Sequence, residues 1–372
     1  MKNLPLAARV SRREFLGRVS AGAALFSLPR PAAGQPPARR KLGVALCGLG
    51  NYARGQLSPA LKLTQNCELR GVVTGSPEKG AVWAGEFGFP AQNIYNYDTM
   101  ARLADNLDID IVYVVTPNAL HAPHVIAAAG AKKHVICEKP MAVSVAECDA
   151  MLTACRVNKV KLSIGYRLQF EPHYEELKRH ARELDWGMFT LMSGGHSFVM
   201  TEPQWRAERK LAGGGPLMDL GIYAVQAACM AAGGVAPVAV TAFEAPKLRP
   251  EFFRDVEETI AWTMEFTSGA HGDFSTSYNG TLDKFRAEAA KGWIEINPAY
   301  SYAGLKAITE TGPLNLAVPP SQQAVQIDDF ARCVRDDLPT RVPGELGRRD
   351  MVIIEAIYAS AAQGGKRIVI KA

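Results

Sequence analysis

Short apolar runs alternate with amphipathic segments along the first half of the chain, from Lys41 to Tyr166. Runs rich in Val, Ile, Leu and Ala predict buried strands at 41–50, 67–75, 109–118, 134–140 and 161–166. Apolar residues at helical spacing predict helices at 51–63, 78–88, 121–133 and 145–158. Strands and helices that alternate at this spacing predict right-handed βαβ units, and therefore an α/β domain with a doubly wound parallel sheet.

The pattern changes after Tyr166, where strand-like runs follow one another with only turns between them. Such runs occur at 188–198, 238–246, 257–266, 269–280 and 291–298. Helical periodicity marks 171–185, 214–231, 322–336 and 348–363. Consecutive strands with flanking helices predict an α+β domain over 167–372, built on a largely antiparallel open sheet. We expect ligands to bind where the two domains meet, at the carboxyl ends of the parallel strands.

Residues 1–34 differ from the rest of the chain in charge and hydropathy. They contain six basic residues against one acidic residue, and so account for the whole formal net charge of +5. The segment 11–16, Ser-Arg-Arg-Glu-Phe-Leu, matches a twin-arginine export signal. The apolar run 19–28 behind it is too short to span a bilayer, which takes about 20 residues. We therefore predict a twin-arginine signal peptide over 1–34, a short proline-rich arm over 35–40, and a periplasmic protein that is exported folded.

The composition of the whole chain is that of a soluble globular protein, with 48% hydrophobic and 21% charged residues over 372 positions. Basic and acidic residues balance beyond Gly34, so the charge does not favour a polyanionic partner such as nucleic acid. The seven cysteines are odd in number and form no C-x-x-C or Cys/His cluster. We therefore predict neither an obligatory disulfide nor a metal site.

Candidate chemistry begins at residues 48–53, which read G-x-G-x-x-A between the first predicted strand and helix, as the dinucleotide fingerprint requires. Gly48 permits a tight turn, Gly50 lets the backbone approach a pyrophosphate, and Ala53 allows close helix packing. The phosphates then meet the helix N-terminus. We predict a nucleotide-binding Rossmann domain over 41–166, in which the cofactor contacts Gly48, Leu49, Gly50, Asn51 and Tyr52.

The end of the second predicted strand bears on the choice between NAD and NADP. An NAD site has an Asp or Glu there for the ribose 2′-hydroxyl, whereas this chain has Thr74 and Ser76, with Lys79 one turn later. Hydroxyls and a cation suit a 2′-phosphate, and the missing carboxylate removes a repulsion. The sequence therefore favours NADP, bound by Thr74, Ser76 and Lys79, although a lysine such as Lys79 is more often solvated on a helix surface.

Two clusters carry candidate proton-transfer groups. Glu138 and Lys139 follow a predicted parallel strand, where Lys139 could bond a substrate hydroxyl beside the nicotinamide. Asp219 and Tyr223 are spaced i, i+4 and so project from one helix face. Together these residues offer a phenol for proton transfer, a cation and an orienting carboxylate. By residue type alone, Glu138 and Lys139 could equally be a solvated pair, Asp219 a helix cap and Tyr223 a core residue.

Several long motifs, in order, resemble the Gfo/Idh/MocA oxidoreductases and, among them, the glucose-fructose oxidoreductases. They are G-L-G-x-Y-A, TPNALHAPH, HVICEKPMAVSVAEC, IGYRLQFEPH, QWRAERKLAGGGPLMDLGIY and VPGELGRRDMVIIEAIYASA, and they extend from Lys41 to the C-terminus. The resemblance implies that Lys139 is catalytic, with Asp219 and Tyr223 as its partners, and that Arg167 and Tyr302 contact the substrate. It also implies cofactor contacts from Pro117, Asn118, His121, Glu138, Lys139, Arg167, Trp205 and Arg206.

The resemblance further implies a periplasmic, NADP-dependent sugar oxidoreductase that works by a ping-pong cycle. An aldose gives its C1 hydride to NADP and leaves as the lactone, and a second sugar, such as a ketose, takes the hydride back and leaves as an alditol. Tyr223 or Lys139 removes the C1 hydroxyl proton in the first half and returns a proton in the second. A homo-dimer or homo-tetramer is also implied.

One departure from the family pattern keeps other functions open. In the glucose-fructose oxidoreductases a long proline-rich arm wraps a neighbouring subunit and helps to hold the cofactor, whereas here the predicted arm is short. An aldose-aldose oxidoreductase, a dehydrogenase or reductase that exchanges NADP(H) and acts on an anhydro-sugar or polyol, and a non-catalytic sugar-binding protein are the alternatives. The intact set of Lys139, Asp219 and Tyr223 argues against the last, because a binding protein needs no proton-transfer groups.

Overall fold

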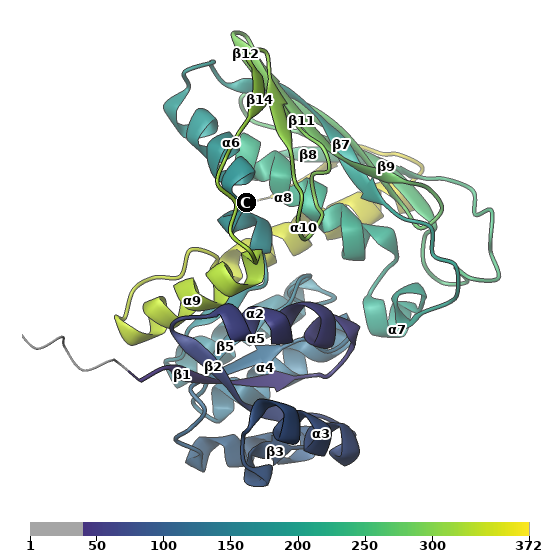
Figure 1. The fold of residues 1–372 in the computed structure, drawn as a ribbon. Helices are drawn as coiled ribbons and strands as arrows, with labels where there is room; N and C mark the ends of the chain where they lie inside the picture. The colour runs from purple at the N-terminus through teal and green to yellow at the C-terminus, as the bar shows by residue number, and fades with distance from the viewer. Residues whose placement is uncertain (1–39, 372) are drawn as a thin grey trace, which may run out of the picture. The chain divides into compact units, whose positions relative to one another are not determined.

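The structure, a computed structural model, describes residues 40–371, and Figure 1 shows the arrangement of their helices and strands. The predicted signal peptide and all but the last residue of the predicted arm lie outside the described residues. Within 40–371, no helix has both the length and the hydropathy needed to cross a membrane. The seven cysteines are all buried with free thiols.

The first sheet is parallel and has the strand order β3-β2-β1-β4-β5-β6. Its strands are β1 (Leu42–Cys47), β2 (Cys67–Val73), β3 (Ile94–Tyr95), β4 (Ile111–Val114), β5 (His134–Cys137) and β6 (Leu162–Ile164). The connecting helices are α2 (Ser58–Leu63), α3 (Pro77–Phe87), α4 (His121–Gly130) and α5 (Val145–Asn158). The predicted doubly wound parallel sheet is confirmed, with β3 as a short edge strand that the sequence pattern did not predict.

The second sheet has nine strands in the order β14-β13-β12-β11-β7-β10-β9-β8-β15. They are β7 (Phe189–Ser197), β8 (Ala239–Glu244), β9 (Thr259–Glu265), β10 (His271–Ser277), β11 (Leu282–Ala289), β12 (Gly292–Ile296), β13 (Ala307–Thr309), β14 (Gly312–Leu314) and β15 (Ile368–Val369). Neighbours are antiparallel except β7 and β10, which run parallel. The predicted, largely antiparallel sheet is therefore confirmed.

Helices cover one face of this second sheet (Figure 1). They are α6 (Pro172–Glu183), α8 (Ile222–Ala231) and α10 (Gly344–Ala362), and α8 contacts β7 while α10 contacts β8. Helix α9 (Gln322–Arg335) packs elsewhere, because Ile327 and Phe330 lie in one hydrophobic cluster with Val44 of β1. The chain thus returns to the first sheet after completing most of the second, and α9 becomes part of the first sheet's hydrophobic core.

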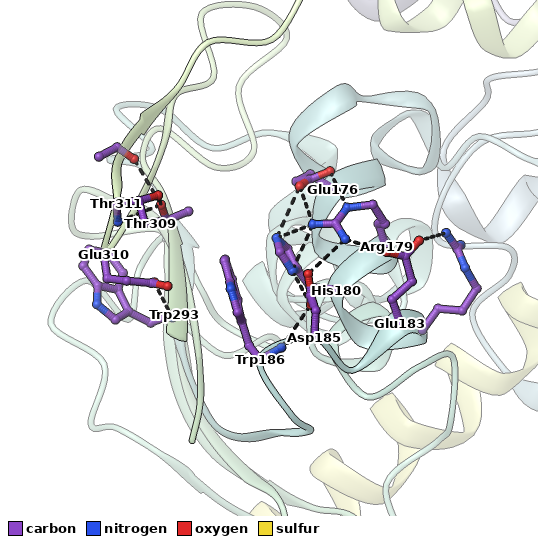
Figure 2. Close-up of polar contacts among 12 residues, drawn as sticks. Glu176, Arg179, His180, Glu183, Asp185, Trp186, Trp293, Thr309, Glu310 and Thr311 are labelled. Carbon is purple, nitrogen blue, oxygen red and sulfur yellow. Dashed lines mark hydrogen bonds and ion pairs between the residues drawn. The ribbon is translucent and has the colours of Figure 1, made fainter. Parts of the chain in front are cut away.

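A charged and aromatic cluster fixes the chain where α6 ends and turns into β7, the central strand of the second sheet (Figure 2). Arg179 pairs with Glu176, at 2.8 Å between Nη2 and Oε1. The His180 ring stacks on Trp186 with 3.5 Å between centroids, and His180 Nδ1 lies 2.7 Å from Asp185 Oδ1. These contacts hold the start of β7, whose far end enters the candidate site.

Candidate active site

Two adjoining hollows lie at the carboxyl ends of the parallel strands. We name them the outer groove, about 680 Å³ in volume, and the inner cavity, about 370 Å³. The outer groove contains the predicted residues Gly48, Leu49, Gly50, Asn51, Tyr52, Thr74, Ser76, Lys79, Pro117, Trp205 and Arg206. The inner cavity contains Tyr52, Asn118, His121, Glu138, Lys139, Arg167, Trp205, Arg206, Asp219, Tyr223 and Tyr302. Because Tyr52, Trp205 and Arg206 line both, one elongated ligand can occupy the groove and reach the cavity.

The glycine loop after β1 forms the floor of the outer groove. Gly48 has φ +105°, and a Cβ there would lie 2.9 Å from the carbonyl oxygen of Val115. A Cβ at Gly50 would meet no atom within 4 Å, so the backbone is open to the groove at this point. Ala53 is fully buried and begins a turn of π-helix, Ala53–Leu57, that leads into α2. This loop can therefore accept a pyrophosphate on its backbone N–H groups, as the motif predicts.

The far end of the groove, where the ribose is expected, carries charges of both signs. Ser76 caps α3, with its Oγ accepting a hydrogen bond from Lys79 N at 3.3 Å. The same hydroxyl donates to Glu78 Oε2 at 3.1 Å, a carboxylate that the sequence analysis did not consider. Tyr97, also missed, lines the groove and follows the short strand β3. Arg54 lies with Glu78 and Lys79 on a neighbouring hollow and forms an ion pair with Glu86, so this end carries two cations and two carboxylates.

Lys139 and Asp219 meet in the inner cavity although 80 residues separate them. Lys139 follows β5, and its Nζ donates to the Asp219 carbonyl oxygen at 2.6 Å and lies 3.3 Å from Asp219 Oδ1. Both side chains are largely buried, with exposed fractions of 13% and 16%. The backbone and side chain of one residue therefore fix the ammonium group in place.

The other carboxylate oxygen of Asp219 has two further partners. Arg206 Nε lies 3.1 Å from Oδ2, and the Tyr278 hydroxyl donates to Oδ2 at 3.1 Å. Burial alone would raise the pKa of the Asp219 carboxyl, but the charges of Arg206 and Lys139 outweigh it and hold that pKa well below the usual range. Asp219 is therefore a permanent anion that positions its neighbours, and Tyr278 is a site residue that no local motif predicted.

Tyr223 lies beside two cations. Lys139 Nζ is 4.7 Å from the centre of its ring, and the Arg167 guanidinium carbon is 5.0 Å from it. Tyr223 is the second residue of α8 (Ile222–Ala231), which directly follows the π-helical turn Leu217–Gly221 that carries Asp219. Both residues line the inner cavity, as their spacing predicts, although the turn between them is wider than an α-helical one.

Glu257, a buried carboxylate, holds the start of this helix. It accepts hydrogen bonds from Gly215 N at 2.9 Å, from Leu217 N at 3.0 Å and from the Tyr358 hydroxyl at 2.8 Å. The glycines before the helix are needed for this packing, because a Cβ on Gly214 would lie 2.0 Å from the Tyr358 oxygen. Glu257 thus satisfies free N–H groups at the helix N-terminus and fixes the position of Asp219 and Tyr223.

Arg167 is buried and holds a segment of the second domain against the cavity. Its guanidinium donates to the carbonyl oxygens of Tyr300 and Ser301 and to the side chain of Gln322. The guanidinium carbon also lies 4.5 Å from the ring centre of Tyr302. The structure therefore brings Arg167 and Tyr302 together as predicted, with Tyr300 and Ser301 as additional members of the cavity wall.

Three of the predicted cofactor residues have partners within the protein. His121 Nδ1 lies 2.9 Å from the Pro140 carbonyl and Nε2 lies 2.8 Å from that of Thr116. Asn118 Nδ2 donates to a backbone carbonyl of α7 (Arg209–Ala212) at 2.9 Å. Glu138 Oε1 accepts from a buried tyrosine hydroxyl at 2.7 Å, and burial raises the pKa of this carboxyl. These residues hold the loops around the cavity as well as lining it.

Known proteins with the same arrangement give the comparison. Two family models match the chain, "Oxidoreductase family, NAD-binding Rossmann fold" over residues 42–166 and "GFO/IDH/MocA C-terminal domain" over residues 174–295. The crystal structure of aldose-aldose oxidoreductase from Caulobacter crescentus, complexed with glycerol, matches 89% of this chain and 100% of that chain at 39% identity, with a TM-score of 0.86.

Two curated relatives are also similar over most of their length. The D-xylose 1-dehydrogenase (NADP(+)) of Haloarcula marismortui is 28% identical over 331 residues, 85% of this chain and 90% of the relative. The D-xylose 1-dehydrogenase (NADP(+)) 2 of Haloferax volcanii is 30% identical over 321 residues, 82% of this chain and 93% of the relative.

A dinucleotide-binding loop joined to a cavity with a lysine, a tyrosine and an ionised aspartate defines a nicotinamide-dependent oxidoreductase. The chain belongs to the Gfo/Idh/MocA oxidoreductase family. The predicted family and the prediction that the protein is an oxidoreductase are therefore confirmed.

Proposed function

We propose that the protein is a periplasmic, NADP-dependent sugar oxidoreductase that oxidises an aldose at C1 and passes the hydride to a second sugar without releasing its cofactor. The observation that carries this proposal is the junction of the two hollows. Lys139, Asp219 and Tyr223 meet in the inner cavity, next to the part that it shares with the outer groove. Proton-transfer groups are thus placed where the reactive end of a dinucleotide would lie.

The residues of the cavity account for the proton part of the reaction. Bound NADP supplies the hydride acceptor for C1 of the donor sugar and the hydride donor for the second sugar. Lys139 Nζ and the Arg167 guanidinium carbon lie 4.7 Å and 5.0 Å from the centre of the Tyr223 ring, and these two cations stabilise negative charge on the reacting oxygen. Tyr223 or Lys139, whichever is deprotonated at the start of the cycle, takes the hydroxyl proton from the donor and returns that proton to the acceptor carbonyl. Asp219 stays ionised and holds Lys139 in place, because its pKa lies well below the usual range.

Several observations favour NADP and sugar substrates. The ribose end of the groove is lined by Lys79, and the curated relatives described above are named for NADP and D-xylose. The similar crystal structure is that of an aldose-aldose oxidoreductase, which makes an aldose as well as a ketose a candidate for the second substrate. Export through the twin-arginine route, which carries folded proteins, suits an enzyme that loads NADP before it leaves the cytoplasm.

The test begins with protein purified from the periplasm without added nucleotide. We expect it to carry NADP, to develop the absorbance of reduced nicotinamide when glucose is added, and to lose that absorbance when fructose or a second aldose follows. Protein that is purified without cofactor and is active only with added NADP would instead be a dehydrogenase that binds and releases NADP(H) in each cycle. No turnover with any sugar, even with NADP supplied, would refute the proposed function.

Two substitutions test the assigned chemistry. We expect Lys139→Ala and Tyr223→Phe each to lose most of the turnover while still binding NADP, because neither side chain lines the outer groove. The measurements are the rate of nicotinamide reduction and the NADP content of the purified variants. Near-normal rates in both variants would contradict the mechanism.

A further inference from the structure

His196 brings a polar ring into the inner cavity from the far end of β7. Its side chain is 19% exposed and lies among aromatic rings, with ring centroids 5.9 Å from Tyr223 and 5.2 Å from Tyr300. The mechanism described above gives this histidine no role. Its sequence context, a strand of small and apolar residues, carries no motif that would have marked it.

The contacts of His196 determine which of its nitrogens carries the proton. Nδ1 lies 3.3 Å from the carbonyl oxygen of Leu282, an atom that can only accept a hydrogen bond. In the neutral ring, Nδ1 therefore carries the proton, and we assign the tautomer on that basis. Burial lowers the pKa of His196, while the charges of Asp283 and Asp219 oppose the shift and that of Lys139 adds to it. Nε2 is then an unprotonated acceptor on a ring that lines the inner cavity.

A role for His196 as general base is not supported by its surroundings. A catalytic histidine is usually oriented by a carboxylate that bonds its second nitrogen. Asp283 is the nearest carboxylate, but its Oδ1 lies 4.0 Å from His196 Nδ1, beyond hydrogen-bond length. That carboxylate instead accepts from Ala299 N at 2.8 Å, from Tyr300 N at 2.6 Å and from the Ser301 hydroxyl at 2.7 Å.

Several polar groups around the cavity can donate hydrogen bonds to a bound sugar, so an uncharged hydrogen-bond acceptor would add a different kind of contact. Lys139 and Arg206 are cations that can only donate hydrogen bonds, and Asp219 is already held by both of them and by Tyr278. A sugar hydroxyl must also donate its own proton, or the binding loses a buried hydrogen bond. We infer that His196 Nε2 accepts a hydrogen bond from a hydroxyl of the donor aldose other than the one oxidised, and so helps to select a polyhydroxylated substrate. This inference rests on the proposed function.

The test compares His196→Phe, which keeps a ring of similar breadth, with His196→Gln, which restores an acceptor near the position of Nε2. For glucose oxidation we expect His196→Phe to raise KM about three- to ten-fold, as loss of one neutral hydrogen bond predicts, and to leave kcat within about two-fold. His196→Gln should recover most of the loss. His271→Phe, a matched control at an exposed histidine of β10, should behave as the wild type.

Monodeoxy glucoses identify the hydroxyl. Relative to glucose, one monodeoxy glucose should lower the kcat/KM of the wild type more than the other monodeoxy glucoses do. For that sugar His196→Phe should have the same kcat/KM as the wild type, because the substitution and the missing hydroxyl remove the same contact. Calorimetric glucose binding to NADP-loaded Lys139→Ala protein, with and without His196→Phe, measures the same contact without turnover. The double variant should bind about three- to ten-fold more weakly.

The possible outcomes separate this inference from the proposed function. If wild type oxidises aldoses and His196→Phe leaves KM, binding and the deoxy-sugar pattern unchanged, only the inference is refuted. If His196→Phe abolishes kcat, changes its pH profile and leaves binding intact, His196 is an acid or base and the inference is again wrong. If wild type neither binds nor oxidises any aldose, the proposed function itself fails.

Discussion

Asp219→Asn is the most direct test of the ion cluster in the cavity. The amide has almost the same shape as the carboxylate but no charge, so Lys139 and Arg206 would keep their positions and lose their shared partner. The substituted side chain can still accept hydrogen bonds at its carbonyl oxygen, but its NH₂ group faces two donors, Arg206 and the Tyr278 hydroxyl. We expect both a loss of stability and a loss of activity.

The magnitude follows from the burial of the three side chains. Lys139 and Asp219 are 13% and 16% exposed, whereas Arg206 is 31% exposed and can recover part of its hydration. Removing one partner of a fully buried pair costs about 3–5 kcal/mol, and removing an exposed one costs about 0–1 kcal/mol. The free energy of unfolding should therefore fall by about 2–4 kcal/mol near neutral pH, between those limits.

The same contacts predict how this difference depends on pH. The pKa of Asp219 is lowered in the folded protein, because the charges of Arg206 and Lys139 outweigh the effect of burial. Stability from a carboxyl with a depressed pKa is fully present above the unfolded value, about 3.9, and is lost as the pH falls through the folded value. The difference between wild type and Asp219→Asn should therefore be constant from about pH 5 to 8 and shrink below about pH 4.

Urea unfolding followed by tryptophan fluorescence at several pH values measures this difference. Asp149→Asn serves as the matched control, since Asp149 forms an exposed ion pair with Arg348 on the surface, and its stability should stay close to that of the wild type. Asp219→Asn with unchanged stability at neutral pH, or with a deficit that grows toward low pH, would refute the reasoning.

Two further predictions concern packing and burial near the site. Gly214→Ala should lower the free energy of unfolding by about 1–3 kcal/mol and reduce turnover, because the added Cβ would lie 2.0 Å from the Tyr358 oxygen. Gly85→Ala, at an open position of α3, is the control and should be neutral or stabilising. Thermal melts of both variants measure the difference in stability. Glu138→Gln should be more stable than wild type at about pH 8 and should lose that advantage toward about pH 5. The reason is that burial raises the pKa of Glu138, so the wild type loses stability as this carboxyl ionises at higher pH. Equal urea midpoints for the two proteins at both pH values would contradict this.

Strands β1, β4, β5 and β6 of the first sheet could be predicted from the sequence because they are short, mostly apolar runs that are almost entirely buried, whereas the edge strand β3 could not. Strand β11 could not, although it lies next to the central strand β7. Only Phe285 and Ala287 are fully buried there, and Lys284, Arg286 and Glu288 occupy the opposite face. Such a segment has a weak intrinsic preference for a strand, so pairing with β7 and β12 decides its structure.

The candidate site divides in the same way. Lys139, Asp219 and Tyr223 could be predicted because each belongs to a local motif beside a strand end or a helix start. Tyr278 and His196 could not, because each follows an ordinary strand pattern. The register of the second sheet places His196 in the cavity wall and the Tyr278 hydroxyl against Asp219. Local sequence thus identified groups beside a strand end or a helix start in both domains, whereas the positions of His196 and Tyr278 depend on pairings between distant strands.

The Asp219 carboxylate is paired with Lys139, Arg206 and the Tyr278 hydroxyl, and these contacts limit which groups of the cavity can transfer a proton. An anion whose pKa is held well below its usual range is a poor proton carrier near neutral pH, which fits the proposed route of the proton through Tyr223 or Lys139. Arg206, which supplies part of this charge balance, also lines the outer groove where the dinucleotide is expected. A cofactor phosphate that attracts Arg206 would weaken its pairing with Asp219 and leave the carboxylate more strongly paired with Lys139. Occupancy of the groove and the position of Lys139 should therefore be coupled through Arg206.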